Sequence, residues 1–263
     1  MRALIVTKAV AAALVSGCAV PSSHAPLQAF EELSLDLGPV GLSVVTIEVV
    51  ETEGSKKFSS VATGVVYARD ETRCIVITAA HALADKVEEI RVTPWGTNLP
   101  ARLATRLHPK TYVPIADVAA IAYPADPYGC PILRSPKATG PVTLGQPVLA
   151  YGSLRVIYPG RPQAIETTVS AGVITGLVPP DGRDGPSLIS SAATPPGFSG
   201  GPVLFSDGSG RSSTLVGITS AMLGDANNPK APVSGFGNRS VITPVLEIER
   251  YLAALLGKTV AVN

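Results

Sequence analysis

The amino-acid sequence predicts an all-β protein, organised as a sandwich or as barrels. Of its 263 residues 16% are charged, 25 are Gly and 24 are Pro, so turn-forming residues are plentiful without reaching the level of a disordered chain. Short segments rich in Val, Ile, Thr and Tyr recur between the turns, and the main helical segment is close to the C-terminus. This composition excludes a collagen, a coiled coil, a polytopic membrane protein and a small disulfide-stabilised protein.

Eight segments are clear examples of the β-strand composition. Each is bounded by Gly, Pro, Asn or Asp, and no long helix separates one from the next, as in sandwiches and barrels. In chain order they are Leu42–Val50, Ser59–Tyr67, Cys74–Thr78, Val87–Thr93, Val118–Tyr123, Pro147–Gly152, Ala164–Ile174 and Leu215–Met222. The chain is long enough to bury a substantial core in one large domain or two small ones.

The C-terminal segment predicts a helix over residues 244–257. Pro244 fits the first turn, where its missing N–H costs no hydrogen bond, and Gly257 stops the helix. Apolar residues recur between them at three- and four-residue spacing, namely Val245, Ile248, Tyr251, Leu252 and Leu255. We expect this helix to close the domain, with no further module after residue 257.

The first seventeen residues predict an export signal. Arg2 and Lys8 are positive, and the apolar segment Ala9–Val15 is too short to span a bilayer. The segment Val15-Ser16-Gly17-Cys18 resembles the lipobox of bacterial lipoproteins. This resemblance implies cleavage before Cys18 and acylation of both its sulfur and its new amine. Ordinary secretion, with cleavage after Ala25, is the alternative.

Anchoring at Cys18 would place the protein in the bacterial cell envelope. Ala19 follows the cysteine, and in enterobacterial lipoproteins a residue other than Asp there directs sorting to the outer membrane. We therefore expect an outer-membrane lipoprotein that faces the periplasm, with a tether over residues 18–38. Removing Arg2 and Lys8 from the 21 basic residues leaves 19 against 20 acidic ones, so the net charge changes from +1 to −1. Attachment would then come from lipid and not from charge.

The segment Gly197-Phe198-Ser199-Gly200-Gly201-Pro202 predicts a serine nucleophile. A serine between glycines in a turn can project its hydroxyl while backbone N–H groups converge beside it to stabilise an oxyanion. The segment also fits the G-x-S-x-G nucleophile elbow of α/β-hydrolases, but that fold needs its histidine after the serine. All three histidines, His24, His81 and His108, precede Ser199, which excludes the elbow.

His81 is the expected general base for Ser199. It follows the apolar strand Cys74–Thr78, and two alanines after the strand permit a tight turn that aims the imidazole. His24 falls in the tether. His108 precedes a proline in a polar stretch and is interpreted as an exposed loop residue.

Asp117 is the expected partner of the histidine Nδ1–H. It begins the apolar strand Val118–Tyr123, where a carboxylate can be partly buried and directional. Asp126, in a Pro-rich turn, and Asp85, very near His81, are the alternatives. The histidine, the aspartate and the serine are separated by 36 and 82 positions, so they meet only through folding, as in a cleft between two barrels.

With these residues in place, the chain resembles the trypsin-like protease domain of the chymotrypsin clan, and most closely the HtrA/Deg proteases, over about residues 40–257. The segments that carry the resemblance are Ala62–Val66, Thr78–His81, Asp117–Ala119, Gly145–Gly152, Thr168–Ile174, Gly197–Pro202 and Leu215–Ser220. The resemblance implies two six-stranded β-barrels and a C-terminal α-helix, here without a PDZ module. Together with the lipobox, it divides the chain into a signal at 1–17, a tether at 18–38 and a protease domain at 39–257, with barrels at about 39–138 and 139–243 and the helix at 244–257.

The resemblance also implies a role for each site residue. Ser199 would attack a peptide carbonyl, His81 would carry the proton to the leaving amine, and Asp117 would orient the imidazole. The N–H groups of Gly197 and Ser199 would form the oxyanion hole.

Two departures from the family pattern concern the nucleophile loop. Phe198 stands where many members have Asp or Asn, which argues against activation by capture of a newly cut N-terminus. Thr194-Pro195-Pro196 restricts the loop and removes N–H groups. Loops of this kind switch between competent and collapsed forms in the HtrA proteases, so a latent resting state is an open alternative.

The resemblance places Ala193, Ser220, Ala221 and Met222 at the border of the substrate pocket. None of them is charged, so a preference for Arg or Lys substrates is unsupported, and we expect a small or medium apolar P1 residue.

Cys74 and Cys130 remain once Cys18 is used for lipid. An oxidising periplasm permits a disulfide between them, and two separate buried thiols are the alternative.

The sequence thus predicts a lipid-anchored serine endopeptidase that acts on proteins or peptides. The alternatives are an esterase-like hydrolase with the same triad and a pseudo-protease that binds peptides without cutting them. A net charge of +1 without an evident basic face gives no support for nucleic-acid binding. No metal or nucleotide motif is found, so we assign no metal and no cofactor.

Overall fold

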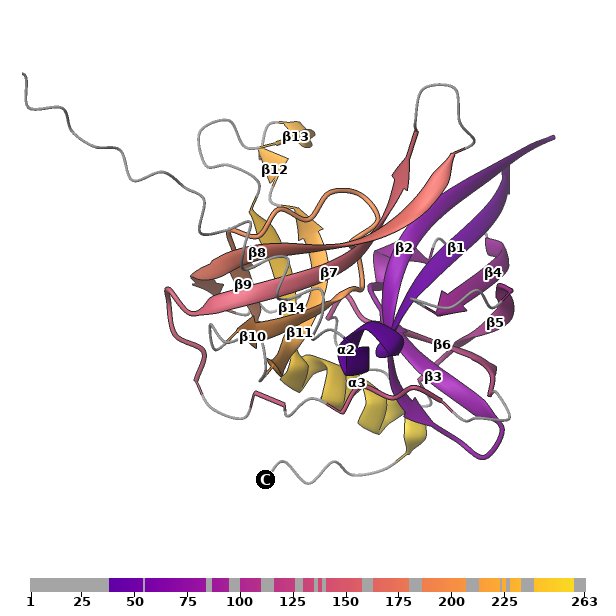
Figure 1. The fold of residues 1–263 in the computed structure, drawn as a ribbon, viewed down its shortest axis with the longest axis horizontal. Coiled ribbons are helices and arrows are strands. Elements are labelled where there is room, and N and C mark those ends of the chain that lie inside the picture. The colour runs from indigo at the N-terminus through magenta and orange to yellow at the C-terminus, as the bar shows by residue number, and fades with distance from the viewer. Residues whose placement is uncertain are drawn as a thin grey trace, which may run out of the picture.

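The computed structural model describes residues 38–53, 55–83, 87–94, 100–109, 116–125, 130–134, 137–138, 141–157, 163–179, 186–206, 213–222, 224–225, 228–232 and 239–257. The expected signal, Cys18 and nearly all of the tether lie outside these residues, as do His24, Asp85 and Asp126. A short helix, α2 (Gly38–Ser43), opens the described part of the chain. Two β-barrels then follow and stand side by side (Figure 1).

Six antiparallel strands close the first barrel. They are β1 (Val44–Glu53), β2 (Lys56–Arg69), β3 (Arg73–Thr78), β4 (Val87–Pro94), β5 (Arg102–Leu107) and β6 (Ala119–Pro124). The hydrogen-bonded order is β1-β2-β3-β6-β5-β4, and β4 pairs with β1 to complete the ring.

Six further strands close the second barrel. They are β7 (Pro147–Val156), β8 (Ala164–Val178), β9 (Ser187–Ser190), β10 (Pro202–Ser206), β11 (Ser213–Met222) and β14 (Ser240–Pro244). The order is β10-β11-β14-β9-β8-β7, and β7 pairs with β10. Counted from its own first strand, the second barrel repeats the strand order of the first. Two short strands, β12 (Gly224–Asp225) and β13 (Asn228–Pro232), form a separate sheet.

The C-terminal helix α3 (Val245–Leu256) connects the second barrel to the first. It follows the last strand of the second barrel, but its Ile248, Leu252 and Leu255 pack with Ile75 and Ile77 of β3. Because side chains alternate along a strand, the other apolar residues of β3 face the interior of the first barrel, where Cys74 and Val76 are buried. The strand that leads to the expected histidine is therefore buried on both faces.

The predicted fold class is confirmed: the described chain forms two closed six-stranded barrels and a C-terminal helix. Two details differ. Pro244 precedes the helix in an extended conformation and does not occupy its first turn, while Gly257 ends the helix with φ 64°. Four barrel strands that the sequence analysis did not identify complete the rings, namely β5, β9, β10 and β14.

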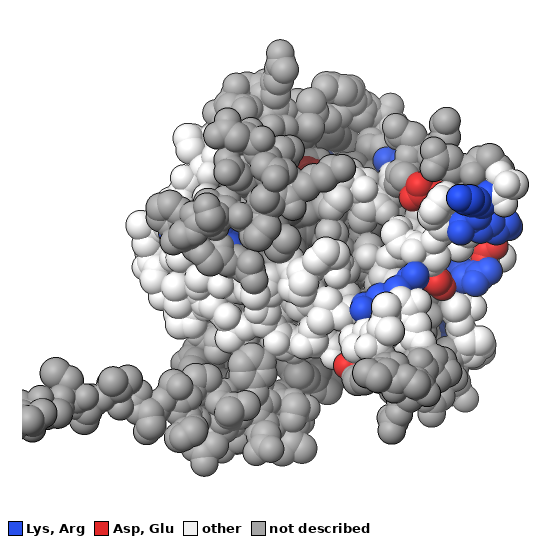
Figure 2. All heavy atoms as spheres, turned by 90° about the horizontal axis from the view of Figure 1, so that it is seen from above, with Lys and Arg blue, Asp and Glu red and all other residues white. Residues whose placement is uncertain are grey.

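Charged side chains of both signs lie next to each other on the surface. On the face drawn in Figure 2 they gather at the end formed by the first barrel, with few over the rest of its described part. Ion pairs on the first barrel include Lys57 with Glu88 and Arg91 with Glu89. Among the described residues, no helix is both long and apolar enough to span a bilayer.

Candidate active site

His81 is positioned by the end of β3 and by the short 3₁₀ helix η1 (Ala80–Ala82) that follows it. The buried strand brings the chain to Thr78, whose hydroxyl donates to the carbonyl of Thr63 on β2 at 2.7 Å. The chain then turns away from the sheet, and the imidazole of His81 is half exposed. Five buried residues of β3 thus lead to an imidazole at a solvent-accessible edge of the barrel.

Asp117 comes to His81 through strand pairing. β3 and β6 are antiparallel, with Thr78 opposite Ala119, so the residue before β6 lies at the same end of the barrel as the residue after β3. The Asp117 Oδ2 atom accepts the Nδ1–H of His81 at 2.6 Å, and its Oδ1 atom accepts the main-chain N–H of His81 at 2.9 Å. Both carboxylate oxygens therefore restrain the histidine.

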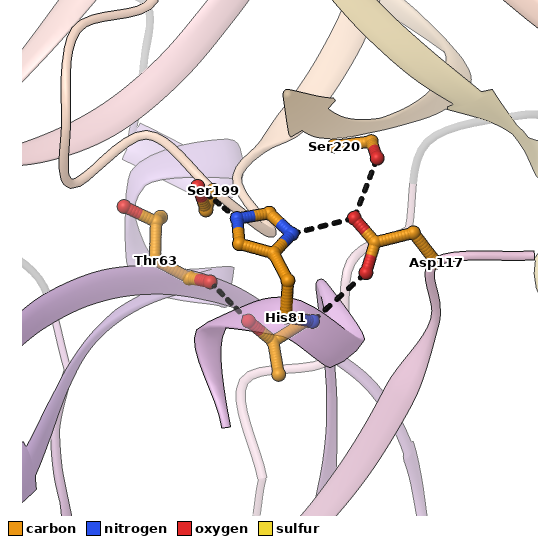
Figure 3. Close-up of polar contacts among 6 residues, drawn as sticks. Thr63, His81, Asp117, Ser199 and Ser220 are labelled. Atoms are coloured by element: carbon orange, nitrogen blue, oxygen red, sulfur yellow. Dashed lines mark hydrogen bonds and ion pairs between the residues drawn. The ribbon is translucent and has the colours of Figure 1, made fainter. Parts of the chain in front are cut away.

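Ser199 reaches the same point from the second barrel. It lies on the segment between β9 and β10, and its Oγ is 2.9 Å from the Nε2 atom of His81 (Figure 3). Because Nδ1 carries the proton donated to Asp117, the neutral imidazole has a free lone pair at Nε2. The Ser199 hydroxyl donates to that lone pair.

Ser220 donates a third hydrogen bond to Asp117. Its hydroxyl donates to Asp117 Oδ2 at 2.5 Å (Figure 3). The register between β11 and β14 shifts between Thr219 and Ala221, so Ser220 is the extra residue of a β-bulge. A bulge re-aims a side chain out of the strand's alternation. The sequence analysis placed Ser220 in the substrate pocket and had no signal for this contact.

These contacts set the charge state of the pair. The hydrogen bond to Asp117 raises the pKa of His81 above its usual 6.5, against the opposite effect of burial. Burial pushes the pKa of Asp117 upward, but hydrogen bonds from His81 and Ser220 outweigh it and hold the pKa below its usual 3.8. Asp117 is thus a carboxylate at neutral pH, as an acceptor of three donors requires.

The backbone of residues 195–198 forms a turn that fits a type II β-turn. Phe198 N–H donates to the carbonyl of Pro195 at 3.1 Å, Pro196 is the second residue, and Gly197 is the third with φ 107°. Proline at the second position and a positive φ at the third are the signature of this turn. A Cβ at Gly197 would lie 1.9 Å from the Ser153 carbonyl oxygen, so only glycine fits here.

The N–H groups in this loop divide into two kinds. Those of Phe198, Gly200 and Gly201 donate to main-chain carbonyls at 3.1, 2.7 and 2.8 Å. Those of Gly197 and Ser199 find no acceptor among the described residues. The carbonyl of Phe198 accepts from Gly201, and because the peptide is trans, the N–H of Ser199 points the opposite way.

Phe198 is an internal anchor for the loop. Its side chain is 1% exposed and packs in the core of the second barrel. The ring lies directly against Gly152 on β7, where an added Cβ would be 2.1 Å from it. Phe198, which departs from the family pattern, therefore fills a hydrophobic position and has no role in binding a charged group.

The remaining residues named in the sequence analysis lie away from these contacts or outside the described side chains. Ala193 is partly buried, and the side chains of Ala221 and Met222 lie outside the described part of the structure. The structure joins Cys74 to Cys130 in a disulfide, with Cα atoms 5.4 Å apart. His108 is exposed beyond β5. Within the described residues, no cluster of His, Cys, Asp and Glu is arranged to hold a metal ion.

Two further residues of the site were missed by the sequence analysis. Thr63 was noted only as part of a strand, and Gly152 only as a strand end, yet both contact the nucleophile loop. No pattern in a single sequence links residues this far apart.

Comparison with known proteins agrees with this geometry. Residues 62–218 match the family of trypsin-like peptidase domains, a segment that begins just before Thr63 and includes His81, Asp117 and Ser199. No curated protein matches the chain significantly. On the strength of the family match and the double-barrel fold, the chain belongs to the trypsin-like peptidase domain family.

Proposed function

We propose that this protein is a serine endopeptidase that works through His81, Asp117 and Ser199. The observation that carries the proposal is the unbroken series of hydrogen bonds from Asp117 through His81 to Ser199, at 2.6 and 2.9 Å. A serine hydroxyl at this distance from a neutral imidazole, itself held by a carboxylate, is the arrangement that activates serine for acyl transfer.

The reaction divides into two steps. Ser199 Oγ attacks the peptide carbonyl carbon while its proton passes to His81 Nε2, and the resulting tetrahedral species collapses as Nε2 gives that proton to the leaving amine. The acyl group stays on Ser199. A water molecule then attacks the ester carbonyl, loses its proton to Nε2, and the proton returns to Ser199 as the acid is released.

The N–H groups of Gly197 and Ser199 serve as the oxyanion hole. Both lack an acceptor in the described part of the chain and are therefore available for an oxygen of the substrate. A single donor of this kind is worth roughly 10²–10³-fold in turnover. The turn at Gly197 supports a loop that is competent at rest, in contrast to the latent alternative raised by the two prolines.

The proposal also covers the substrate preference and the cellular location of the protein. Ala193 and Ser220 carry no charge, which favours a small or medium apolar P1 residue. We also propose that the protein is related in function to the HtrA/Deg-type proteases of the bacterial envelope. The lipobox ending at Cys18 supports a lipid-anchored enzyme that faces the periplasm.

A fluorophosphonate probe tests the proposal directly. We expect the wild-type chain to be labelled, and Ser199→Ala to lose labelling and at least about 10⁴-fold in turnover. Ser191→Ala, which changes an exposed serine on the same segment, is the matched control and should label normally. Digestion of an unfolded protein, followed by mass spectrometry, should show internal cuts.

Each other outcome favours a different alternative. Labelling without peptide cleavage would favour an esterase-like hydrolase. Absence of Ser199-dependent labelling would contradict the proposal and favour a pseudo-protease that binds peptides.

A further inference from the structure

Thr63 lies between the two segments that carry His81 and Ser199. It is in β2 and is fully buried. Its main-chain N–H donates to the carbonyl of Ser199 at 2.9 Å, and its carbonyl accepts the hydroxyl of Thr78 at 2.7 Å. Thr78 ends the strand that leads to His81. One residue of the first barrel therefore contacts both the nucleophile and the base-bearing strand.

The side chain of Thr63 makes a third connection, and its direction is unambiguous. The main-chain N–H of Ser153 donates to the Thr63 hydroxyl oxygen at 2.8 Å. The hydroxyl has one proton of its own, and the carbonyl of Gly197, 2.6 Å away, is an acceptor only. The Thr63 hydroxyl therefore donates to Gly197 and accepts from Ser153.

The Gly197 carbonyl depends on this hydroxyl. Gly197 is buried, and no other donor to its carbonyl is found among the described residues. A buried carbonyl without a partner is costly, so a chain that lacks the hydroxyl would turn this peptide toward another donor. Such a turn also breaks the hydrogen bond from the Phe198 N–H, which is on the same peptide, to the carbonyl of Pro195. The adjoining peptides, which carry the N–H groups of Gly197 and Ser199, then lose the contacts that fix their orientation.

We infer that the Thr63 hydroxyl is a positioning group for the oxyanion hole, an inference that rests on the proposed peptidase function. It holds the Gly197 carbonyl, while the main chain of the same residue holds the Ser199 carbonyl. These two carbonyls belong to the 197–198 and 199–200 peptides. The N–H groups that form the hole belong to the peptides just before them, 196–197 and 198–199, so held peptides and hole-forming peptides alternate along the loop. Thr63 thereby sets the position of the hole relative to His81.

Three substitutions in the full chain test this inference. Thr63→Val keeps the shape and removes the hydroxyl, and Thr63→Ser restores the hydroxyl. Thr46→Val is the matched control, because Thr46 is also buried and its hydroxyl bonds to the Ser153 side chain at 2.7 Å without touching the loop. Peptide kinetics, fluorophosphonate labelling rates, thermal unfolding and hydrogen exchange of residues 195–201 are measured for each.

We expect Thr63→Val to lower kcat by about 10- to 100-fold, less than the loss of a whole oxyanion donor, with KM changed by no more than about twofold. The labelling rate should fall in parallel. Thr63→Ser and Thr46→Val should keep kcat within about threefold of wild type. Residues 195–201 should exchange faster in Thr63→Val than in either of the other variants.

The outcomes separate this inference from the proposed function. If the wild-type chain cleaves peptides and Thr63→Val has the same kcat, the inferred role of Thr63 is overturned. The proposed peptidase function is then unaffected. Equal kinetic losses in Thr63→Val and Thr46→Val, matching their thermal destabilisation, show a purely structural role and also overturn it. If the wild-type chain is inert, the peptidase proposal fails, and unchanged exchange of residues 195–201 in Thr63→Val then overturns the positioning role as well.

Discussion

Under the proposed peptidase function, His81 is the residue whose titration should govern activity. Its Nε2 atom must be unprotonated to take the Ser199 proton, and the hydrogen bond to Asp117 raises its pKa above 6.5. A raised pKa means that the imidazole becomes protonated, and unable to act as a base, at a higher pH than an isolated histidine. The acid side of the activity profile therefore reports the Asp117–His81 contact.

The first prediction concerns this profile. We expect kcat/KM of the wild-type chain to rise with pH and to reach half its maximum above pH 6.5. In Asp117→Asn, loss of the charged acceptor should lower the pKa of His81, shift that midpoint to lower pH, and reduce kcat by about 10⁴-fold. Labelling rates with a fluorophosphonate, measured across pH, are sensitive enough for the weak variant. An unchanged midpoint in Asp117→Asn would show that another group controls the profile.

How well single residues can be predicted depends on whether their signal is local. Ser199 and His81 stand in distinctive local sequences, and the order of His and Ser along the chain excluded the α/β-hydrolase arrangement. Ser220 meets Asp117 only because a bulge turns it out of β11, and a bulge depends on pairing with β14. The role of Thr63 likewise depends on a contact across 134 residues.

Among the elements, every barrel strand of eight or more residues was predicted, as were the apolar β3 and β6, whereas the four strands that were missed have only four to six residues. β3 has five buried residues in succession, because one face lines the barrel and the other packs on α3. β9 has only four residues, two of them serines, and β5 alternates between partly buried and exposed positions along most of its length. Such strands form because neighbouring strands need partners for their N–H and C=O groups, which is a property of the closed ring.

The disulfide between Cys74 and Cys130 ties two elements of the first barrel together. It joins β3 to the segment after β6 at a sequence separation of 56, and Leu133 in that segment donates its N–H to the carbonyl of Val66 at 2.8 Å. We predict that Cys74→Ala/Cys130→Ala lowers the free energy of unfolding by roughly 2–4 kcal/mol, since closing a long loop restricts the unfolded chain.

Urea denaturation with and without reductant checks this prediction. The experiment uses a Cys18→Ser background, so that a third thiol does not interfere. Reductant should lower the stability of the parent chain to that of the double variant and should leave the double variant unchanged. A parent chain insensitive to reductant even when unfolded would mean that the two cysteines remain separate thiols.

At the scale of the whole molecule, the site belongs to neither barrel alone. The first barrel provides His81, Asp117 and Thr63, and the second provides Ser199, Gly197 and Ser220. The helix α3 holds the pair together by packing residues that follow the second barrel against β3 of the first. The geometry of the proposed active site is therefore set by how the barrels pack on each other.

The last prediction concerns where the whole molecule resides. If Cys18 is acylated, the protein should fractionate with membranes and be released by detergent, whereas Cys18→Ser should appear in the soluble fraction. Cys130→Ser is the control and should stay with the membranes. A wild-type protein that is soluble and begins at Pro26 would instead show ordinary secretion with cleavage after Ala25.

The closure of both barrels has a consequence for colloidal behaviour. A formal net charge of +1, or −1 after loss of the expected signal, provides little electrostatic repulsion between molecules. Protection against self-association must then come from elsewhere. Each of the twelve barrel strands already has a hydrogen-bonded neighbour on both sides, so the rings offer no open edge on which another chain can add a strand. In this fold, the strand edges of the barrels are protected by topology and not by charge.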